Sequence, residues 1–226
     1  MKIYYHGHSC FSLITSNFRL LIDPWIKENP SSDLDHETVD CDYILVSHGH
    51  FDHLGDAVEI AKRTDATIIG VVELASYCEK QGVKTHGMQI GGEYQFPFGR
   101  IYLTPALHGS AIIEENTYLG LACGFVIENN GTSVYHAGDT GIFSEMQILG
   151  NRFSLDLAIL PIGDNFTMGP KDALLATQLL KPKLVVPMHY NTFELIRQDP
   201  IAFKDALESH TSAQCVIMSV GDLLEI

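Results

Sequence analysis

The side chains best suited to chemistry are concentrated in one short stretch, HGHFDH at positions 48–53. His48, His50, Asp52 and His53 directly follow an apolar run that predicts a buried strand. Because alternate side chains of an extended segment point the same way, His48 and His50 can reach one ion together. Imidazole nitrogen and carboxylate oxygen suit Zn(II), and equally Mn, Fe or Ni. The stretch therefore predicts a metal site rather than a solvated loop.

The spacing His48-x-His50-x-Asp52-His53 resembles the signature of the metallo-β-lactamase superfamily. That family also expects an aspartate after an early strand, a histidine ending a mid-chain strand, an aspartate after glycine, and a late histidine. These positions are filled, in order, by Asp23, His108, Asp139 and His189. The stretches GHSCF, LIDPW, LPIGDNFTMGP and VVPMHYNTF further resemble a branch of small metal-dependent hydrolases, which is similar to the ascorbate-6-phosphate lactonase group.

The resemblance implies a site for two divalent metal ions, with Zn expected and Mn, Fe or Ni as alternatives. The expected ligands form three sets: His48, His50 and His108 for the first ion; Asp52, His53 and His189 for the second; and Asp139 as the bridge. Two cations about 3.5–4 Å apart lower the pKa of a shared water, which gives hydroxide at neutral pH. Asp52 is the expected catalytic residue, because it would bind one ion and orient that hydroxide towards the electrophile.

Other residues are expected to support this site. Asp23 is expected to accept a hydrogen bond from the distal N–H of a ligating histidine. His8 is expected either to serve the site as a hydrogen-bond donor or proton shuttle, or to be a structural histidine. His136 is expected to form hydrogen bonds within the metal cradle, and Gly49 to relieve crowding between the first two ligands. Asn165 could hold a substrate oxygen, although asparagine is also an ordinary turn former.

Short strands and helices must position these residues. Apolar runs predict strands over residues 2–5, 10–15, 19–22, 43–46, 67–71, 93–96, 100–104, 121–128, 133–136, 155–160, 184–187, 215–219 and 223–226. Helical spacing predicts helices over residues 54–63, 73–81, 170–180 and 201–209. Asn129-Asn130-Gly131 predicts a hairpin turn. We expect one α/β domain over 1–226, a four-layer αββα sandwich of two mixed sheets flanked by helices.

Composition narrows the class of protein. The 226 residues include 14 basic and 28 acidic side chains, and the formal net charge is −14. Nucleic-acid binding is disfavoured, because it needs clustered Lys and Arg. No apolar run reaches the ~18 residues of a membrane span. The five cysteines are scattered and odd in number, which indicates reduced thiols and a cytoplasmic protein. The sequence leaves homo-oligomer formation open.

The sequence thus predicts a dinuclear metal-dependent hydrolase. The expected reaction is attack by a metal-bridging hydroxide on an ester, lactone or phosphodiester of a small anionic substrate. Antibiotic hydrolysis is disfavoured, because Asp139 stands where many true β-lactamases have cysteine. Two alternatives remain at this point: a metal-dependent nuclease acting on RNA or DNA, and a non-catalytic domain that senses a metal or ligand.

Overall fold

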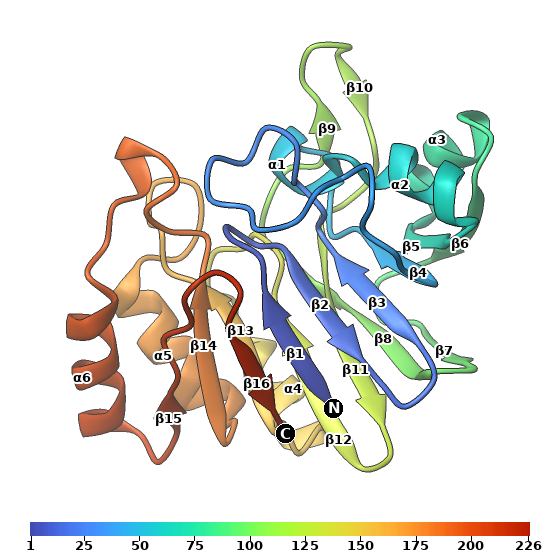
Figure 1. Ribbon diagram of the computed structural model, residues 1–226. Coiled ribbons are helices and arrows are strands. Elements are labelled where there is room, and N and C mark those ends of the chain that lie inside the picture. The colour runs from blue at the N-terminus through green and yellow to red at the C-terminus, as the bar shows by residue number, and fades with distance from the viewer.

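The computed structural model describes all residues 1–226, and its centre is a pair of seven-stranded sheets with helices on their outer faces (Figure 1). The first sheet has the order β16-β1-β2-β3-β4-β5-β6. Its strands are β1 (Lys2–Tyr5), β2 (Phe11–Ile14), β3 (Arg19–Ile22), β4 (Tyr43–Leu45), β5 (Thr67–Val71), β6 (Lys84–Met88) and β16 (Leu223–Glu225). Pairing is antiparallel from β16 to β3 and parallel from β3 to β6, so the sheet is mixed.

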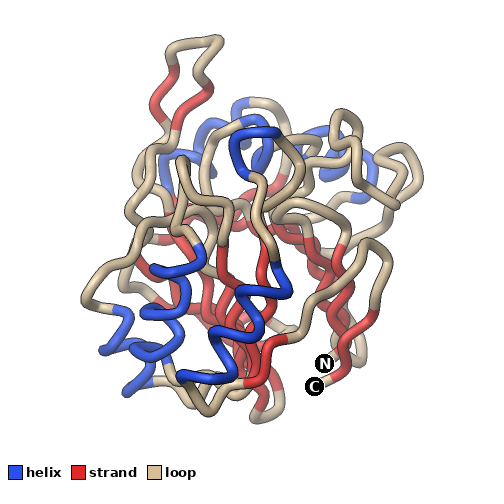
Figure 2. Tube along the Cα trace, turned by 90° about the vertical axis from the view of Figure 1, so that its left-hand side faces the viewer, coloured by secondary structure: helices blue, strands red, loops and turns tan.

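The second sheet has the order β15-β14-β13-β12-β11-β8-β7 and is mixed as well. Its strands are β7 (Glu93–Phe96), β8 (Gly99–Pro105), β11 (Cys123–Asn129), β12 (Thr132–His136), β13 (Leu157–Pro161), β14 (Leu184–Met188) and β15 (Gln214–Cys215). A separate hairpin, β9 (Ala111–Ile112) and β10 (Thr117–Tyr118), projects from the body of the protein (Figures 1 and 2).

Helices cover the outer face of each sheet. The chain forms α1 (Phe51–Leu54), α2 (Ala57–Thr64), α3 (Val72–Lys80), α4 (Met146–Arg152), α5 (Pro170–Leu180), α6 (Pro200–His210) and a 3-10 turn, η1 (Glu194–Ile196). Helices α2 and α3 contact β5, whereas α5 contacts β13 and α6 contacts β15. No helix combines the length and the apolar character needed to cross a membrane.

Strand β11 shows how alternating side chains build two cores. Phe125 and Ile127 belong to a large buried cluster between the sheets, while Val126 belongs to a second cluster beneath the helices. Strand β13 does the same, because Ile159 faces the first cluster and Leu160 the second. Successive side chains of a strand point to opposite faces, so β11 and β13 each supply both cores. The expected four-layer sandwich is therefore confirmed.

Most expected elements are present, and some boundaries differ. The expected helix over 54–63 is instead two helices, α1 and α2, separated at Gly55. The φ of Gly55 is 42°, and a Cβ there would lie 2.5 Å from the carbonyl oxygen of Pro24. The expected strand over 215–219 is only the two-residue β15, and β6, β9, β10 and α4 were not predicted from the sequence.

The expected hairpin turn joins β11 to β12. Asn130 and Gly131 have φ values of 49° and 85°, the left-handed conformation that asparagine and glycine tolerate. This turn lies at the end of the second sheet opposite to Asp139 and His189, which follow the far ends of β12 and β14.

Candidate metal centre

The side chains of the expected site gather where strands of both sheets end. His48 follows β4, Asp139 follows β12 and His189 follows β14. Asp23 follows β3, and His108 lies three residues beyond β8. Functional groups commonly collect at the carboxyl ends of parallel strands, because loops leave the sheet together there. The fold thus brings together residues that are far apart in the chain, such as Asp23 and His189.

The first set consists of three imidazoles, as expected. The Nε2 atom of His48 lies 3.0 Å from Nδ1 of His50, and Nε2 of His108 lies 3.2 Å from that same Nδ1. Burial lowers the pKa of all three rings, so they are neutral at pH 7 and their nitrogen lone pairs are available. A single metal ion could bind these three ring nitrogens at once, whereas a hydrogen bond could link only two of them.

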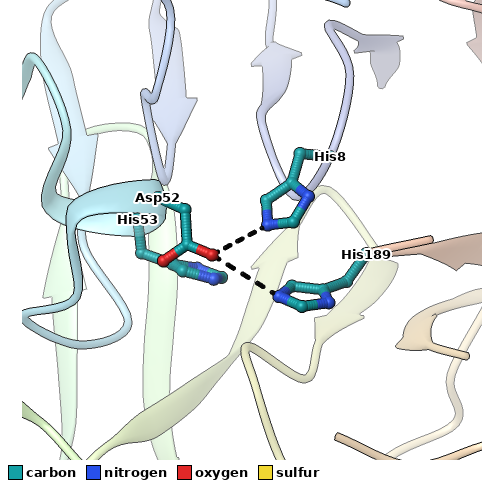
Figure 3. A group of neighbouring side chains, drawn as sticks. All are labelled: His8, Asp52, His53 and His189. Atoms are coloured by element: carbon teal, nitrogen blue, oxygen red, sulfur yellow. Dashed lines mark hydrogen bonds and ion pairs between the residues drawn. The ribbon is translucent and has the colours of Figure 1, made fainter. Parts of the chain in front are cut away.

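The second set contains Asp52, His53 and His189, together with His8 (Figure 3). Asp52 Oδ2 lies 3.1 Å from His8 Nε2 and 3.7 Å from His189 Nε2. His8 is fully buried, and burial with the neighbouring His189 lowers its pKa to about 4. The neutral ring donates through Nε2 to Asp52 and accepts from the Thr192 hydroxyl at Nδ1, over 3.0 Å.

Asp139 lies between the two sets. Its Oδ1 is 3.3 Å from His53 Nε2, and its Oδ2 is 3.0 Å from His189 Nε2 and 3.6 Å from His108 Nε2. Burial alone would raise the pKa of this carboxyl, but His189 and His53 hold it well below the usual range. Asp139 is therefore an anion that reaches ligand atoms of both sets.

Several buried polar atoms of the centre have no hydrogen-bond partner. They are His53 Nε2, both ring nitrogens of His189 and Asp139 Oδ1. The two Nε2 atoms nevertheless lie within 3.3 Å of Asp139 oxygens, so these atoms are close together without being aligned for a hydrogen bond. Buried polar groups are normally paired, and atoms that converge without pairing suit a shared cation. The residues present therefore fit divalent metal ions.

Asp23 contacts one candidate ligand of the second set directly and one of the first set through Ser47. Its Oδ2 accepts a hydrogen bond from His53 Nδ1 over 2.8 Å and another from the Ser47 hydroxyl over 2.7 Å. The same hydroxyl lies 3.0 Å from His48 Nδ1, so it can accept the proton of that ring. Such contacts fix the tautomer and direction of a ligating imidazole. The contact of Asp23 with a histidine was predicted from the sequence, whereas the relay through Ser47 was not.

Of the other residues expected to support the site, some lie at the centre and others do not. His136 is buried and contacts the Ser9 carbonyl and the Gly138 amide, which are hydrogen bonds of the cradle. Asn165 is exposed and does not line the cavity over the metal centre. A Cβ on Gly49 would lie 2.6 Å from a Leu119 methyl, so this glycine admits Leu119 rather than separating His48 from His50.

Three residues of the centre have left-handed backbone conformations. The φ values are 56° for His8, 45° for Asp23 and 54° for His189. Residues other than glycine rarely adopt these angles, at a cost of order 1–3 kcal/mol each. The surrounding packing must hold all three in place, and such conformations cluster at functional sites.

A cavity of about 500 Å³ opens over the centre. Its floor contains candidate ligands of both sets, and its remaining lining is Phe51, Ile113, Phe166, Phe193 and Leu195. No lysine or arginine lines it, so the anionic substrate that the sequence predicted has no cationic side chain to meet there. These apolar residues could not be predicted as a group from the sequence, because they lie on four separate segments and follow no common pattern.

The fold and the centre define the class of protein: an αββα sandwich with a His/Asp cluster able to bind metal at the edge of its sheets. Residues 18–190 match the family model described as the beta-lactamase superfamily domain. The chain is 52% identical over 232 residues to a UPF0173 metal-dependent hydrolase of Heliobacterium modesticaldum, covering 100% of this chain and 98% of that protein.

Solved structures of similar fold support the same assignment. Igni18, a metallo hydrolase from Ignicoccus hospitalis, is 40% identical with a TM-score of 0.91, covering 100% of this chain and 98% of that one. An isothiocyanate hydrolase from Delia radicum gut bacteria shares the fold, with 22% identity, a TM-score of 0.81 and coverage of 100% and 99%. The chain belongs to the β-lactamase superfamily, among the UPF0173 metal-dependent hydrolases, and it is a metal-dependent hydrolase.

Proposed function

We propose that the protein hydrolyses an ester, lactone or phosphodiester with two divalent metal ions, Zn being the expected metal. His48, His50 and His108 would hold one ion, Asp52, His53 and His189 the other, and Asp139 would contact both. The observation that carries the proposal is the position of Asp139, whose oxygens lie 3.0–3.6 Å from ligand nitrogens of both sets. Bound ions would lower the pKa of a water molecule and polarise the bond to be broken.

The chain's own residues give Asp52 a defined role in this reaction. His8 donates a hydrogen bond to Asp52 Oδ2, and Thr192 in turn fixes the His8 ring. The carboxylate of Asp52 is therefore oriented towards the cavity that it lines, where it can accept a proton from the attacking water. The position of His8 supports the expected role as a hydrogen-bond donor to the site.

Metal content and turnover test the proposal together. The purified protein is expected to contain about two equivalents of divalent metal and to hydrolyse a model ester or phosphodiester. His48→Ala removes a nitrogen ligand of the first set, so we expect loss of one equivalent and of most turnover. Elemental analysis and steady-state rates provide the measurement, and circular dichroism verifies the fold. A folded wild-type protein that binds no metal would contradict the proposal.

Replacement of Asp23 by asparagine is expected to weaken both metal sites. The amide side chain would still fill the space but would accept the His53 and Ser47 protons less strongly. The rings of His53 and, through Ser47, of His48 would then be held less firmly in their orientation. Loss of such a partner lowers metal affinity by about 10–100-fold. Competition against a chromophoric chelator measures the affinity. Asp40→Asn, at an exposed carboxylate paired with Arg19, is the matched control and should keep wild-type affinity. Equal affinities for the two variants would rule out the relay.

A further inference from the structure

The wall above the metal centre is built from apolar side chains of four separate segments. Phe51 comes from α1, Ile113 from the β9–β10 hairpin, Phe166 from the loop after β13, and Phe193 with Leu195 from the segment after β14. From this wall we infer that the substrate is a neutral carboxylic ester or lactone with an apolar acyl group. The inference rests on the proposed function and specifies its substrate class.

Exposure of the wall favours an apolar partner. Phe51, Ile113, Phe166 and Leu195 are each at least half exposed, although they are large apolar side chains. A concentration of such side chains around one opening typically marks a binding site, because covering them removes apolar surface from water. The volume of about 500 Å³ also lies within the range of small-molecule sites. An acyl chain of several carbons can therefore lie against the wall.

The charges of the cavity lining also favour a neutral substrate. The polar lining of the cavity consists of the ligand residues His50, Asp52, His108, Asp139 and His189. Because no cationic side chain accompanies them, only the metal centre itself could attract negative charge. A carbonyl oxygen can reach that centre while the rest of the substrate needs no ionic partner. A phosphodiester with further charged groups would place them against apolar surface, which is unfavourable.

The reaction of this substrate balances without another reactant. Water adds across the acyl C–O bond: its oxygen forms the new bond to the acyl carbon, and the C–O bond to the alcohol breaks. One proton of the water goes to the alcohol oxygen, and the other is released to solvent, so the acid leaves as a carboxylate. A lactone gives both groups in one hydroxy acid. The apolar acyl group takes no part in bond changes, so its length affects only binding and positioning.

A chain-length series provides the first test. The probes are p-nitrophenyl acetate, butanoate, hexanoate and octanoate, with bis(p-nitrophenyl) phosphate as the anionic comparison, all with the metal-loaded protein. We expect kcat/KM to rise about two- to fourfold for each methylene that the wall covers. The double variant Phe166→Ala/Leu195→Ala should lower the hexanoate-to-acetate ratio at least about fivefold. Ile148→Ala, at an exposed isoleucine on α4 outside the cavity lining, should keep that ratio.

Trp25 provides a readout independent of turnover. It is the only tryptophan, and its ring lies 5.6 Å from those of Phe51 and Phe193, directly behind the wall. We expect unbranched primary amides, from acetamide to octanamide, to change the fluorescence of Trp25, with affinity for the amide rising along the series. The double variant should flatten that rise, and Ile148→Ala should not.

The possible outcomes distinguish failure of the inferred substrate class from failure of the proposed function. Metal-dependent hydrolysis of the acetate without any rise along the ester or amide series would overturn the inference and leave the proposed function standing. A clear preference for the phosphodiester, about tenfold or more in kcat/KM, would also overturn it. Absence of metal-dependent hydrolysis with every probe would instead contradict the proposed function, while the amide titration would still test the wall.

Discussion

Replacement of Asp139 by alanine is expected to abolish hydrolysis and to remove metal from both sets of ligands. Asp139 is the one carboxylate whose oxygens lie within 3.6 Å of His108 on one side and of His53 and His189 on the other. Loss of a residue that merely orients a metal ligand costs about 10–100-fold. Because Asp139 is proposed to bind both ions, its loss should cost more, and we expect a loss of about 10³-fold or more in kcat/KM. Steady-state kinetics and elemental analysis measure the two effects.

The matched control for this variant is Asp205→Ala. Asp205 is an exposed carboxylate on α6, and its side chain accepts no hydrogen bond. We expect wild-type metal content and activity from it, so a general effect of removing one negative charge is separated from the effect at the site. If Asp139→Ala bound two metal ions and kept more than roughly a tenth of the activity, Asp139 would not be the bridge.

The part of the site that the sequence predicts best is the stretch 48–53. Its candidate ligands are close in the chain, in the loop after β4 and in α1, so local geometry alone brings His48 and His50 together. The long-range members, such as His108 and Asp139, depended on the resemblance to a family, since no periodic pattern connects them. The structure brings all of them into one cluster.

Other parts of the site depend on tertiary packing. Ser47 contacts Asp23 only because β3 and β4 pair in parallel, which places the ends of both strands together. Phe193 reaches Trp25 and the cavity through a loop with no strand or helix signal of its own. Single exposed apolar residues are common on protein surfaces, so their convergence becomes visible only in three dimensions.

The same reasoning explains which elements the sequence predicted. The strand over 19–22 and the helix over 170–180 coincide with β3 and α5, because each has a strong apolar pattern and a clear boundary. The helix over 54–63 was wrong at its start, because the apolar spacing continues through Gly55 while the backbone does not. The hairpin of β9 and β10 has two-residue strands, which are too short to show alternation.

Removal of the metal ions is expected to lower the melting temperature by roughly 15–30 °C. Each ion that binds the folded but not the unfolded chain stabilises it by about 4 kcal/mol at a free concentration roughly 1,000 times its Kd. For two sites this gives about 8 kcal/mol, and each kcal/mol shifts the melting temperature of a domain of this size by roughly 2–4 °C. Differential scanning calorimetry with excess metal and then with excess chelator measures the shift.

The physical basis of that shift lies in the buried ligand atoms. Without a cation, Asp139 Oδ1, His53 Nε2 and His189 Nε2 are buried and make no aligned hydrogen bond, a condition that costs about 1–3 kcal/mol for each group. His48→Ala/His189→Ala removes one ligand from each set, so its melting temperature should no longer respond to metal. His210→Ala, at an exposed histidine ending α6, is the matched control and should keep the full response. A melting temperature that chelation leaves unchanged in the wild type would show that the cluster holds no structural cation.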